Sequence, residues 1–309
     1  MSAFAAKPTI GVIVITHNAK HHLPKCLPPY LESPLQPRVL VVNSSSNDGT
    51  VETAQQLGAE TLVIPRGEFN HGSTRELARR HLGTDIIVMI TPDAYAQDKH
   101  TLQHLVAHLI EKKASVAYAR QIPHQGADFF ESFSREFNYP AESHIRSLQD
   151  VHTYGVYTYF CSNSSAAYLN SALDEIGGFN TVLLGEDTVA VSKLLHLGHK
   201  IAYVSEAVVS HSHRYTLLQE FQRSFDTGLA REGYRHLFSG VNDSKRGRAY
   251  VRQLSSKLWR EKPYLLPYAY VQSLVKWMGY KIGVHSVKAP LWFKRALSSQ
   301  DFYWQNKTS

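Results

Sequence analysis

The sequence predicts an α/β fold in which a mostly parallel sheet is flanked by helices. Short apolar runs alternate with helix-compatible segments, polar residues follow the apolar runs, and 309 residues are enough to bury a sizeable core. The runs are continuously apolar, which indicates strands covered on both faces. They cover residues 9–16, 38–43, 61–65, 85–91 and 115–120.

Helix-compatible segments separate these apolar runs. Residues 20–32 follow the first run, residues 50–57 connect the second run to the third, and another helix opens near residue 71. The segment 99–112 has a clear helical period, because its apolar residues recur at spacings of three and four. Those residues are Leu102, Leu105, Val106, Leu109 and Ile110. This alternation favours parallel strands joined by helical crossovers.

Polar residues at the ends of the apolar runs predict a binding site. Ligands of such sheets bind at the carboxyl ends of the strands, so we expect these residues to converge on one edge. They are Thr16, Asn18, Asn43, Ser45, Asp48, Thr91 and Asp93. THNAKHH stands where a dinucleotide-binding G-x-G-x-x-G turn would follow the first strand, and the chain contains no P-loop motif. The sequence therefore predicts a nucleotide-sized polar edge without a dehydrogenase or NTPase fingerprint.

The stretch GEFNHGSTRELARRHLG contains a candidate anion site. A helix that begins at His71 and Gly72 presents backbone N–H groups and the positive end of its dipole, and Arg75 adds a cation. An ordinary capped helix explains the same residues, because Asn70 or Ser73 suits a helix start. The local sequence leaves both interpretations open.

Composition indicates a globular chain without a disulfide framework. Hydrophobic residues make up 43% of the chain and charged residues 19%. The two cysteines, Cys26 and Cys161, occur in unrelated contexts, which favours reduced thiols. The N-terminal segment lacks a charged region followed by a long apolar stretch, so we expect no signal peptide and a cytoplasmic location.

The C-terminal region differs from the rest of the chain. From Lys245 onward it contains 13 lysines and arginines against two acidic residues, whereas the whole chain has a net charge of +7. Aromatic residues among these cations indicate contact with anionic lipid head groups; a solvated basic face and a nucleic-acid surface are rival interpretations, of which we expect nucleic acid least. The segment PYLLPYAYVQSLV is too short to cross a bilayer. We expect one domain over residues 1–215 and a helical, basic, membrane-associating region over residues 216–309.

Nine motifs occur in order over nearly the whole chain. They are VIVITHN, VVNSSSNDGT, FNHGSTRELA, MITPDA, ARQIPH, ESFSREFNYP, CSNSSAAYL, EIGGFN and GEDTVAVSKLLHLGHKIAYVSEAVVSHSHRYTLLQEFQRSFDTG. In order and spacing they resemble the family 2 inverting glycosyltransferases with the GT-A fold, in particular the bacterial rhamnosyltransferase branch. The resemblance implies transfer of L-rhamnose from dTDP-L-rhamnose to a bacterial surface polysaccharide such as O-antigen, with inversion. It also suits a saccharide acceptor on a lipid carrier at the inner membrane face.

The resemblance implies an acidic catalytic base in the motif GEDTVA. Glycosyl transfer needs a base for the acceptor hydroxyl and stabilisation of the departing diphosphate. We prefer Asp187 to its neighbour Glu186 as this base. Taken alone, the local sequence is also explained by a helix start, where acidic side chains complement the dipole.

Many members of the resembled family hold Mg²⁺ or Mn²⁺ with an Asp-x-Asp pair. This chain has Asp93 alone in TPDAY, so His211 or His213 in SHSHRY is expected to supply a second ligand. Residues two apart on an extended segment point to the same side. Imidazole suits Mn²⁺ better than Mg²⁺. Zinc hydrolysis is a rival interpretation, but a third ligand at regular spacing is not visible.

The donor is expected along the strand ends. Gly72 and Arg75 would face the nucleotide or its diphosphate, and His71 the sugar. The residues expected at thymine and ribose are Thr16, Asn18, Asn43 and Asp48. Asn43 replaces an aspartate frequent in the resembled family, although an amide still pairs with a pyrimidine edge. Turn and capping roles explain the same residues.

The segment RQIPHQGADFFESFSREFNYP is assigned to the acceptor side. Sugars stack on aromatic rings and bond planar polar groups, and the candidates are Arg120, Asn138 and Tyr139. An amphipathic helix explains the aromatic residues at least as well. Two functional alternatives stay open: the same chemistry with another nucleotide sugar, and a GT-A-like module that binds saccharide or membrane without turnover.

Overall fold

The computed structural model describes residues 7–238, 241 and 243–305 of the chain, which divide into two units. The first unit comprises Met1–Asp150, Tyr159–Thr181 and Glu186–Ser212, and the second comprises Val151–Thr158, Val182–Gly185 and His213–Ser309. The predicted boundary at residue 215 stays a prediction. Residues 1–6, on which the signal-peptide expectation partly rests, and Lys307 of the basic region lie outside the described residues.

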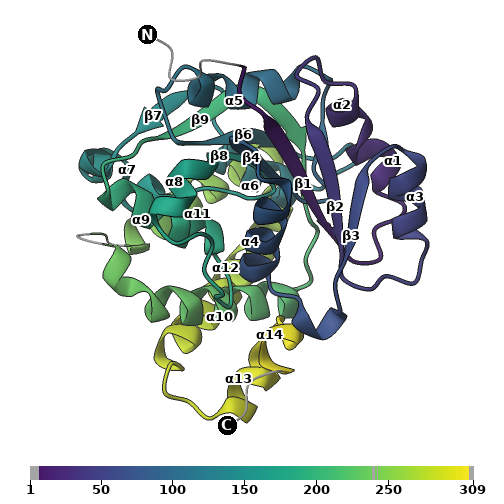
Figure 1. Ribbon diagram of the computed structural model, residues 1–309. Helices are drawn as coiled ribbons and strands as arrows, with labels where there is room; N and C mark the ends of the chain where they lie inside the picture. The colour runs from purple at the N-terminus through teal and green to yellow at the C-terminus, as the bar shows by residue number, and fades with distance from the viewer. Residues whose placement is uncertain (1–6, 239–240, 242, 306–309) are drawn as a thin grey trace. The chain divides into compact units, whose positions relative to one another are not determined.

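The strands of the described chain form one sheet in the first unit (Figure 1). They are β1 (Ile10–Thr16), β2 (Arg38–Asn43), β3 (Glu60–Val63), β4 (Ile86–Ile90), β5 (Tyr95–Ala96), β6 (Val116–Ile122), β7 (His144–Arg146), β8 (Ser165–Leu169) and β9 (Ile201–Ser210). Their order is β3-β2-β1-β4-β8-β6-β9-β5, and β7 also pairs with β9. The predicted α/β class, with a sheet flanked by helices, is confirmed.

Strand direction changes across the sheet. Strands β3, β2, β1 and β4 are parallel, as predicted, and β6 is parallel to β9. In contrast, β8 is antiparallel to both β4 and β6, and β5 and β7 are antiparallel to β9. The parallel half therefore follows the predicted pattern, while the other half is mixed.

Both faces of the central strands are buried. Val12 and Val14 of β1 pack in a cluster with Leu23 and Leu105, which lie on helices following β1 and β5. Ile13, between the two valines, is also fully buried. Burial on both faces explains why the runs are apolar without alternation.

The helices of the first unit connect these strands. They are α1 (Leu23–Cys26), α2 (Pro28–Leu31), α3 (Thr50–Gln56), α4 (His71–Leu82), α5 (Thr101–Ile110), α6 (Phe129–Asn138), α8 (Asn170–Glu175) and α9 (Glu186–His196). Single-turn 3₁₀ helices lie at Arg66–Glu68 and Leu148–Asp150. The segment 20–32, predicted as one helix-compatible stretch, forms two short helices, each with a proline in its first turn.

Capping residues set several helix starts. Asn70 precedes α4 and its side chain accepts hydrogen bonds from the N–H groups of Gly72 and Ser73, a cap of about 1 kcal/mol. The helix ends at Gly83, where φ is +60°. Asp128 and Glu131 form a reciprocal capping box at the start of α6.

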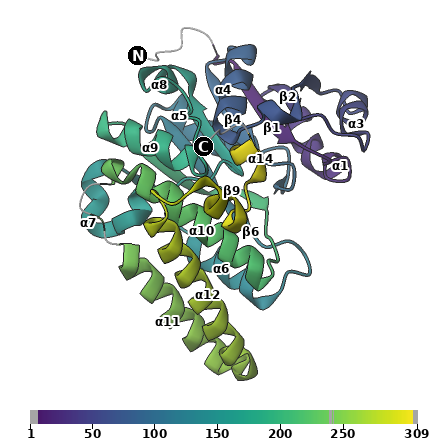
Figure 2. The same cartoon turned by 90° about the horizontal axis from the view of Figure 1, so that it is seen from below.

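The second unit is helical. Its helices are α7 (Val151–Tyr154), α10 (Leu217–Gly233), α11 (Asp243–Glu261), α12 (Leu266–His285), α13 (Leu291–Leu297) and α14 (Asp301–Gln305). Helices α11 and α12 lie side by side, and α12 also packs along α10 (Figure 2). In the described part of the chain, no helix combines the length and the apolar character that a membrane crossing requires.

Candidate active site and metal centre

Asp187 lies in the first turn of α9, and its carboxylate is held by two backbone N–H groups. The N–H of Asn163 donates to Oδ2 at 3.1 Å, and the N–H of Thr188 donates to Oδ1 at 2.6 Å. Asn163 lies just before β8, so the antiparallel strand brings this donor to the start of α9. The side chain of Asp187 is thereby fixed while the residue stays partly exposed.

Glu186, the neighbouring carboxylate, is paired with Arg75 of α4. The Nη1 atom of Arg75 donates to Glu186 Oε1 at 2.6 Å, and both side chains are less than one tenth exposed. The amide nitrogen of Asn163 donates to the same oxygen at 3.0 Å. The hydroxyl of Tyr168 in turn donates to Asn163 Oδ1 at 2.7 Å, which fixes the orientation of that amide. Asn163 therefore contacts both carboxylates.

The environments of the two carboxylates shift their pKa values in opposite directions. Burial raises the pKa of Asp187 to about 6, and the negative charge of Glu186 adds to this rise. Burial also opposes ionisation of Glu186, but the positive charge of Arg75, with His71 and the Asn163 amide, holds the pKa of Glu186 below its ordinary value. A group with a pKa near 6 is ionised at neutral pH and still accepts a proton readily, as a general base must.

The start of α4 has the capped arrangement rather than an open anion site. Asn70 occupies the N–H groups of Gly72 and Ser73, as described above. The Cα of Gly72 packs against the carbonyl of Asn180, so that a Cβ there would collide with it. Arg75 is 3% exposed and bonded to Glu186 and to the carbonyl of His71. The predicted contacts of this helix start with a diphosphate stay a prediction; in the structure its first donors and its arginine are engaged within the fold.

The loops after β1 and β2 form one hydrogen-bonded network. The register places Thr16 beside Asn43, and the Asn43 amide donates to Thr16 Oγ1 at 3.2 Å and to Ser46 Oγ at 2.6 Å. Both Thr16 and Asn43 are buried, so they shape the loop from within. Asp48 accepts from the N–H groups of Lys20 and Thr50.

Two of the predicted donor contacts are exposed at this edge. Asn18 and Ser45 have φ values of 48° and 52°, in the left-handed region, and both are solvent-exposed. Ser45 Oγ donates to the carbonyl of Ile64 at 2.9 Å, while Asn18 Oδ1 accepts from the N–H of Asn47 at 3.2 Å. These positions, rather than the buried Thr16 and Asn43, are accessible to a ligand.

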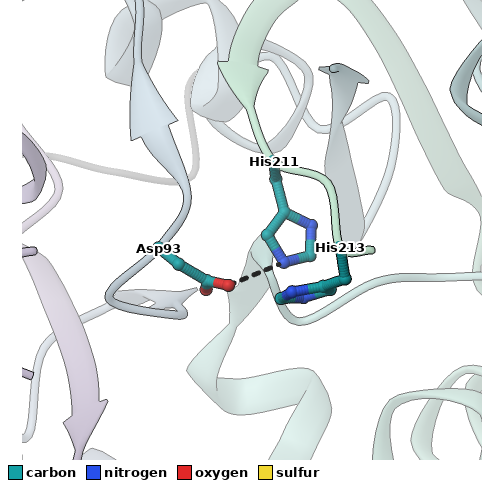
Figure 3. A group of neighbouring side chains, drawn as sticks. All are labelled: Asp93, His211 and His213. Carbon is teal, nitrogen blue, oxygen red and sulfur yellow. Dashed lines mark ion pairs between the residues drawn. The ribbon is translucent and has the colours of Figure 1, made fainter. Parts of the chain in front are cut away.

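Asp93, His211 and His213 come together as a candidate metal centre (Figure 3). Strand β5 pairs antiparallel with β9, with Tyr95 opposite Ser210, and this register brings Asp93 to the segment after β9. The Nε2 atom of His211 lies 3.4 Å from Asp93 Oδ2. One ligand atom of each of the three residues lies within 4.8 Å of the others. Thr91, on the same loop as Asp93, has a buried hydroxyl with no hydrogen-bond partner among the described residues.

A buried glutamine orients His211. The Oε1 atom of Gln121 accepts from Arg135 Nη1 at 2.6 Å and lies 2.8 Å from His211 Nδ1, while the Gln121 amide nitrogen donates to Ser162. Because Oε1 can only accept, the His211 proton belongs on Nδ1, which directs the Nε2 lone pair toward Asp93. The Nε2 lone pair of His211 and the carboxylate of Asp93 are both electron donors that face each other, so a cation between them would be bound by both. The donor set of one carboxylate and two imidazoles therefore fits a divalent ion, and Mn²⁺ better than Mg²⁺.

The three predicted acceptor residues occupy different environments. Tyr139 is 4% exposed, and its ring packs against those of Phe160 and Tyr203, so it lies in the core and its assignment to the acceptor stays a prediction. Asn138 ends α6 and its amide donates back to the carbonyl of Ser134 at 2.9 Å. Arg120 lies partly buried on β6, opposite Val208 of β9.

Two residues of this site were missed by sequence reasoning. Asn163 and Gln121 lie within the motifs CSNSSAAYL and ARQIPH, but neither stood out as a candidate. A polar residue beside a strand is usually read as a turn or cap residue. Their partners lie 23 and 90 residues away in sequence, so only the fold reveals the contacts.

Comparison with known proteins places this geometry in context. The model of the glycosyl transferase family 2 matches residues 11–177. The chain is 34% identical over 304 residues to the O-antigen chain rhamnosyltransferase RfbN of Salmonella typhimurium, covering 96% of each chain. It is 35% identical over 274 residues to the O-antigen chain rhamnosyltransferase WbaN of Salmonella anatum, covering 87% of this chain and 86% of the relative.

Solved structures support the fold. A mannosyltransferase from Pyrobaculum calidifontis, PcManGT, in complex with GDP-Man and Mn²⁺, aligns over 98% of this chain and 87% of its own, with a TM-score of 0.58 and 16% identity. TarS residues 1–349 from S. aureus aligns over 96% of this chain and 89% of its own, with a TM-score of 0.54 and 15% identity.

Proposed function

Because the chain belongs to glycosyl transferase family 2, we propose that it transfers L-rhamnose from dTDP-L-rhamnose to a saccharide acceptor in bacterial surface polysaccharide synthesis, with inversion at the anomeric carbon. The observation that carries this proposal is the pair Glu186 and Asp187 at the start of α9, of which Glu186 is neutralised by Arg75. The similarity to two proteins named O-antigen chain rhamnosyltransferases supports rhamnose as the transferred sugar.

Asp187 is the general base of the proposed reaction. The acceptor hydroxyl oxygen forms a bond to the anomeric carbon while the bond from that carbon to the diphosphate oxygen breaks. The hydroxyl proton passes to a carboxylate oxygen of Asp187, and dTDP leaves with the bonding electron pair. Two backbone N–H groups orient the carboxylate, so little reorganisation is needed when the proton moves.

Glu186 and Arg75 act as positioning residues in this proposal. The ion pair anchors the start of α9 to α4, and Asn163 links the pair to Asp187. The negative charge of Glu186 also favours the protonated form of Asp187, which keeps the pKa of Asp187 in the range of a general base.

Asp93, His211 and His213 would hold a divalent metal ion, Mn²⁺ or Mg²⁺. When bound, the ion supplies positive charge for the departing diphosphate. Gln121 prepares His211 for this role, because it sets which ring nitrogen carries the proton. Arg135 and Ser162 fix the Gln121 amide in turn.

The nucleotide is assigned to the carboxyl ends of β1 and β2. Asn18 and Ser45 are the exposed polar groups there, and Asp48 maintains the loop through the N–H groups of Lys20 and Thr50. Thr16 and Asn43 contribute from inside the loop. We further propose that the acceptor is carried on a lipid and that residues 1–215 perform transfer while residues 216–309 associate with the inner membrane face.

Calorimetric titration of the purified protein tests donor and metal together. The ligands are dTDP, UDP and dTDP-L-rhamnose, each with Mn²⁺, Mg²⁺ or EDTA. We expect metal-dependent binding with a preference for dTDP over UDP. A preference for UDP would contradict the donor assignment, and absence of binding to all three would favour a module without turnover.

Manganese titration followed by electron paramagnetic resonance tests the metal centre without a turnover assay. We expect Gln121→Met to weaken Mn²⁺ binding about tenfold, because the buried partner of His211 Nδ1 is lost while side-chain volume is nearly kept. Gln103→Met, at a partly exposed position of α5, is the matched control. Equal Mn²⁺ affinities of both variants and the wild type would contradict the assigned role of Gln121.

A further inference from the structure

The exposed face of α12 is apolar over two turns. Its side chains are 53%, 48%, 54%, 58% and 42% exposed in chain order, and they recur at i, i+1, i+4, i+7 and i+8. These residues, here called the α12 face, are Tyr270, Val271, Leu274, Trp277 and Met278. An ordinary surface helix presents polar side chains to water at such positions, so this contiguous apolar surface needs an explanation.

Polar side chains of the same turns point into the unit instead. The amide of Gln272 donates to Glu220 Oε1 of α10 at 3.2 Å, and Lys276 Nζ lies 3.2 Å from the same oxygen. Gln272 is 6% exposed. The usual arrangement of a surface helix, with its polar side facing solvent, is therefore reversed in this part of α12.

Close packing fixes the rotation of α12 about its axis. Gly279 and Gly283 of α12 lie against the carbonyls of Phe221 and Phe225 of α10, and Gly228 of α10 lies against the carbonyl of Tyr280. A Cβ at any of these glycines would collide with backbone. Because only glycine fits along this contact, the helix cannot turn to bury the α12 face without separating from α10.

Further aromatic and basic side chains are exposed at both ends of this face. Trp259 and Tyr264, which precede α12, are 73% and 74% exposed. Exposed cations lie near the face in sequence, both before and after it, with one acidic residue, Glu261, beside two of them. Among these cations are Arg260, Lys262, Lys281 and Lys288.

We propose that the α12 face docks on an anionic lipid surface. Aromatic and aliphatic side chains enter the boundary between head groups and acyl chains, while lysines and arginines reach lipid phosphates. The charge arrangement favours lipid over nucleic acid, because a phosphate backbone needs cations at the centre of the contact, where this face is apolar. The helix lies on the surface in this arrangement, in agreement with the absence of a spanning helix in the described chain.

This inference deepens the proposed function and rests on it in one respect: an acceptor carried on a lipid would then be presented at the surface to which the enzyme binds. It does not depend on rhamnose as the donor sugar. Lipid binding and donor binding are therefore measured separately.

Sedimentation with vesicles tests the docking surface. Full-length protein is mixed with vesicles of phosphatidylcholine alone, or of phosphatidylcholine with phosphatidylglycerol. We expect binding mainly to the anionic vesicles, weakened by added salt, and we expect the double variant Leu274→Ser with Trp277→Ser to bind at least about tenfold more weakly. Serine adds no charge, so the loss would report the apolar contact.

Leu197→Ser provides the matched control, because Leu197 is 57% exposed and lies in the first unit. Its vesicle binding is expected to equal that of the wild type. Equal binding by the double variant, or equal binding to neutral and anionic vesicles, would overturn the proposal. A wild-type dimer in light scattering that the double variant converts to monomer would also overturn it, because the face would then join two copies.

Calorimetry with dTDP distinguishes failure of this inference from failure of the proposed function. Retained dTDP binding in the double variant shows that the first unit is folded, and an unchanged helical signal in circular dichroism shows the same for the second unit, so that any loss on vesicles is local. If the wild type does not bind vesicles but binds dTDP, the docking surface is rejected while the proposed function stands.

Discussion

The starts of α4 and α9 resemble each other in sequence but differ in what they present. Each follows a glycine-containing or asparagine-containing loop and has polar residues in its first turn. At α4, Asn70 occupies the N–H groups and the chain at Asn180 packs on Gly72. At α9, two carboxylates occupy the first turn, and α4 supplies Arg75 to one of them. The role of a helix start therefore depends on which groups already contact its first turn within the fold. The local sequence pattern does not show these contacts.

The difference has a chemical consequence for the two acidic residues. Arg75 neutralises Glu186, so the cation of α4 contributes to the start of α9 in this structure. Asp187 is left with two backbone donors and the repulsion of Glu186. One of two adjacent carboxylates thus becomes structural and the other becomes the candidate base.

The largest expected effect comes from Asp187→Asn. An amide cannot take the acceptor proton, so we expect transfer to fall about 1,000-fold or more while dTDP affinity is unchanged. Transfer from dTDP-L-rhamnose and calorimetric dTDP binding measure the two quantities. Full turnover by the purified variant would remove Asp187 from the proposed role and erase the distinction between the two helix starts.

A smaller loss, of stability rather than chemistry, is expected for Arg75→Ala. The substitution leaves Glu186 buried without its cation, at a cost of about 3 kcal/mol in the free energy of unfolding. Urea denaturation measures this change. Arg80→Ala is the control, because Arg80 lies on the same helix with its side chain 69% exposed. If Arg75→Ala weakened dTDP binding while unfolding stayed unchanged, the original anion-site interpretation would be restored.

The smallest expected effect is a shift in pH dependence for Glu186→Gln. The base must be ionised, so wild-type kcat/KM should rise with pH and level off above about pH 6, the pKa of Asp187. Glutamine removes the negative charge that helps to raise this pKa, so the acidic limb should move to lower pH by about one unit. Rates measured between pH 4.5 and pH 8 report the limb, after circular dichroism has established at each pH that the variant is folded. A limb that stays in place, or moves to higher pH, would contradict the coupling between the carboxylates.

Much of the parallel half of the fold could be predicted from sequence. The apolar runs correspond to β1, β2, β3, β4 and β6. Four of these strands are apolar because they are largely buried on both faces, whereas β3 lies at the edge of the sheet with Glu60 and Val63 exposed, so the expected burial on both faces is wrong for it. Strand β8 was not predicted: its five residues, SAAYL, are too short and too rich in alanine for a period to emerge. Yet β8 is antiparallel to both its neighbours and follows Asn163, so the missed strand carries part of the candidate site.

In the candidate site too, some residues could be predicted from sequence and others could not. Asp187, Asp93 and the two histidines were named from motifs, and the structure brings the latter three together. The burial of Tyr139 could not be predicted, because the sequence of a polar segment does not show whether its aromatic residue faces a ligand or the core. The role of Gln121 could not be predicted, since a glutamine orients a histidine only if β6 and β9 are neighbours.

The sequence by itself determined the strands of the parallel half, the approximate starts of the helices between them, and which residue types are available for acid–base and metal chemistry. These follow from local periodicity, capping and side-chain chemistry. Only the tertiary structure decided which carboxylate is neutralised, which helix start is already occupied and which face of α12 is left exposed. The physical reason is that burial, ion pairing and close helix contact depend on groups far apart in the chain. Arg75 and Glu186, separated by 111 residues, are the plainest case.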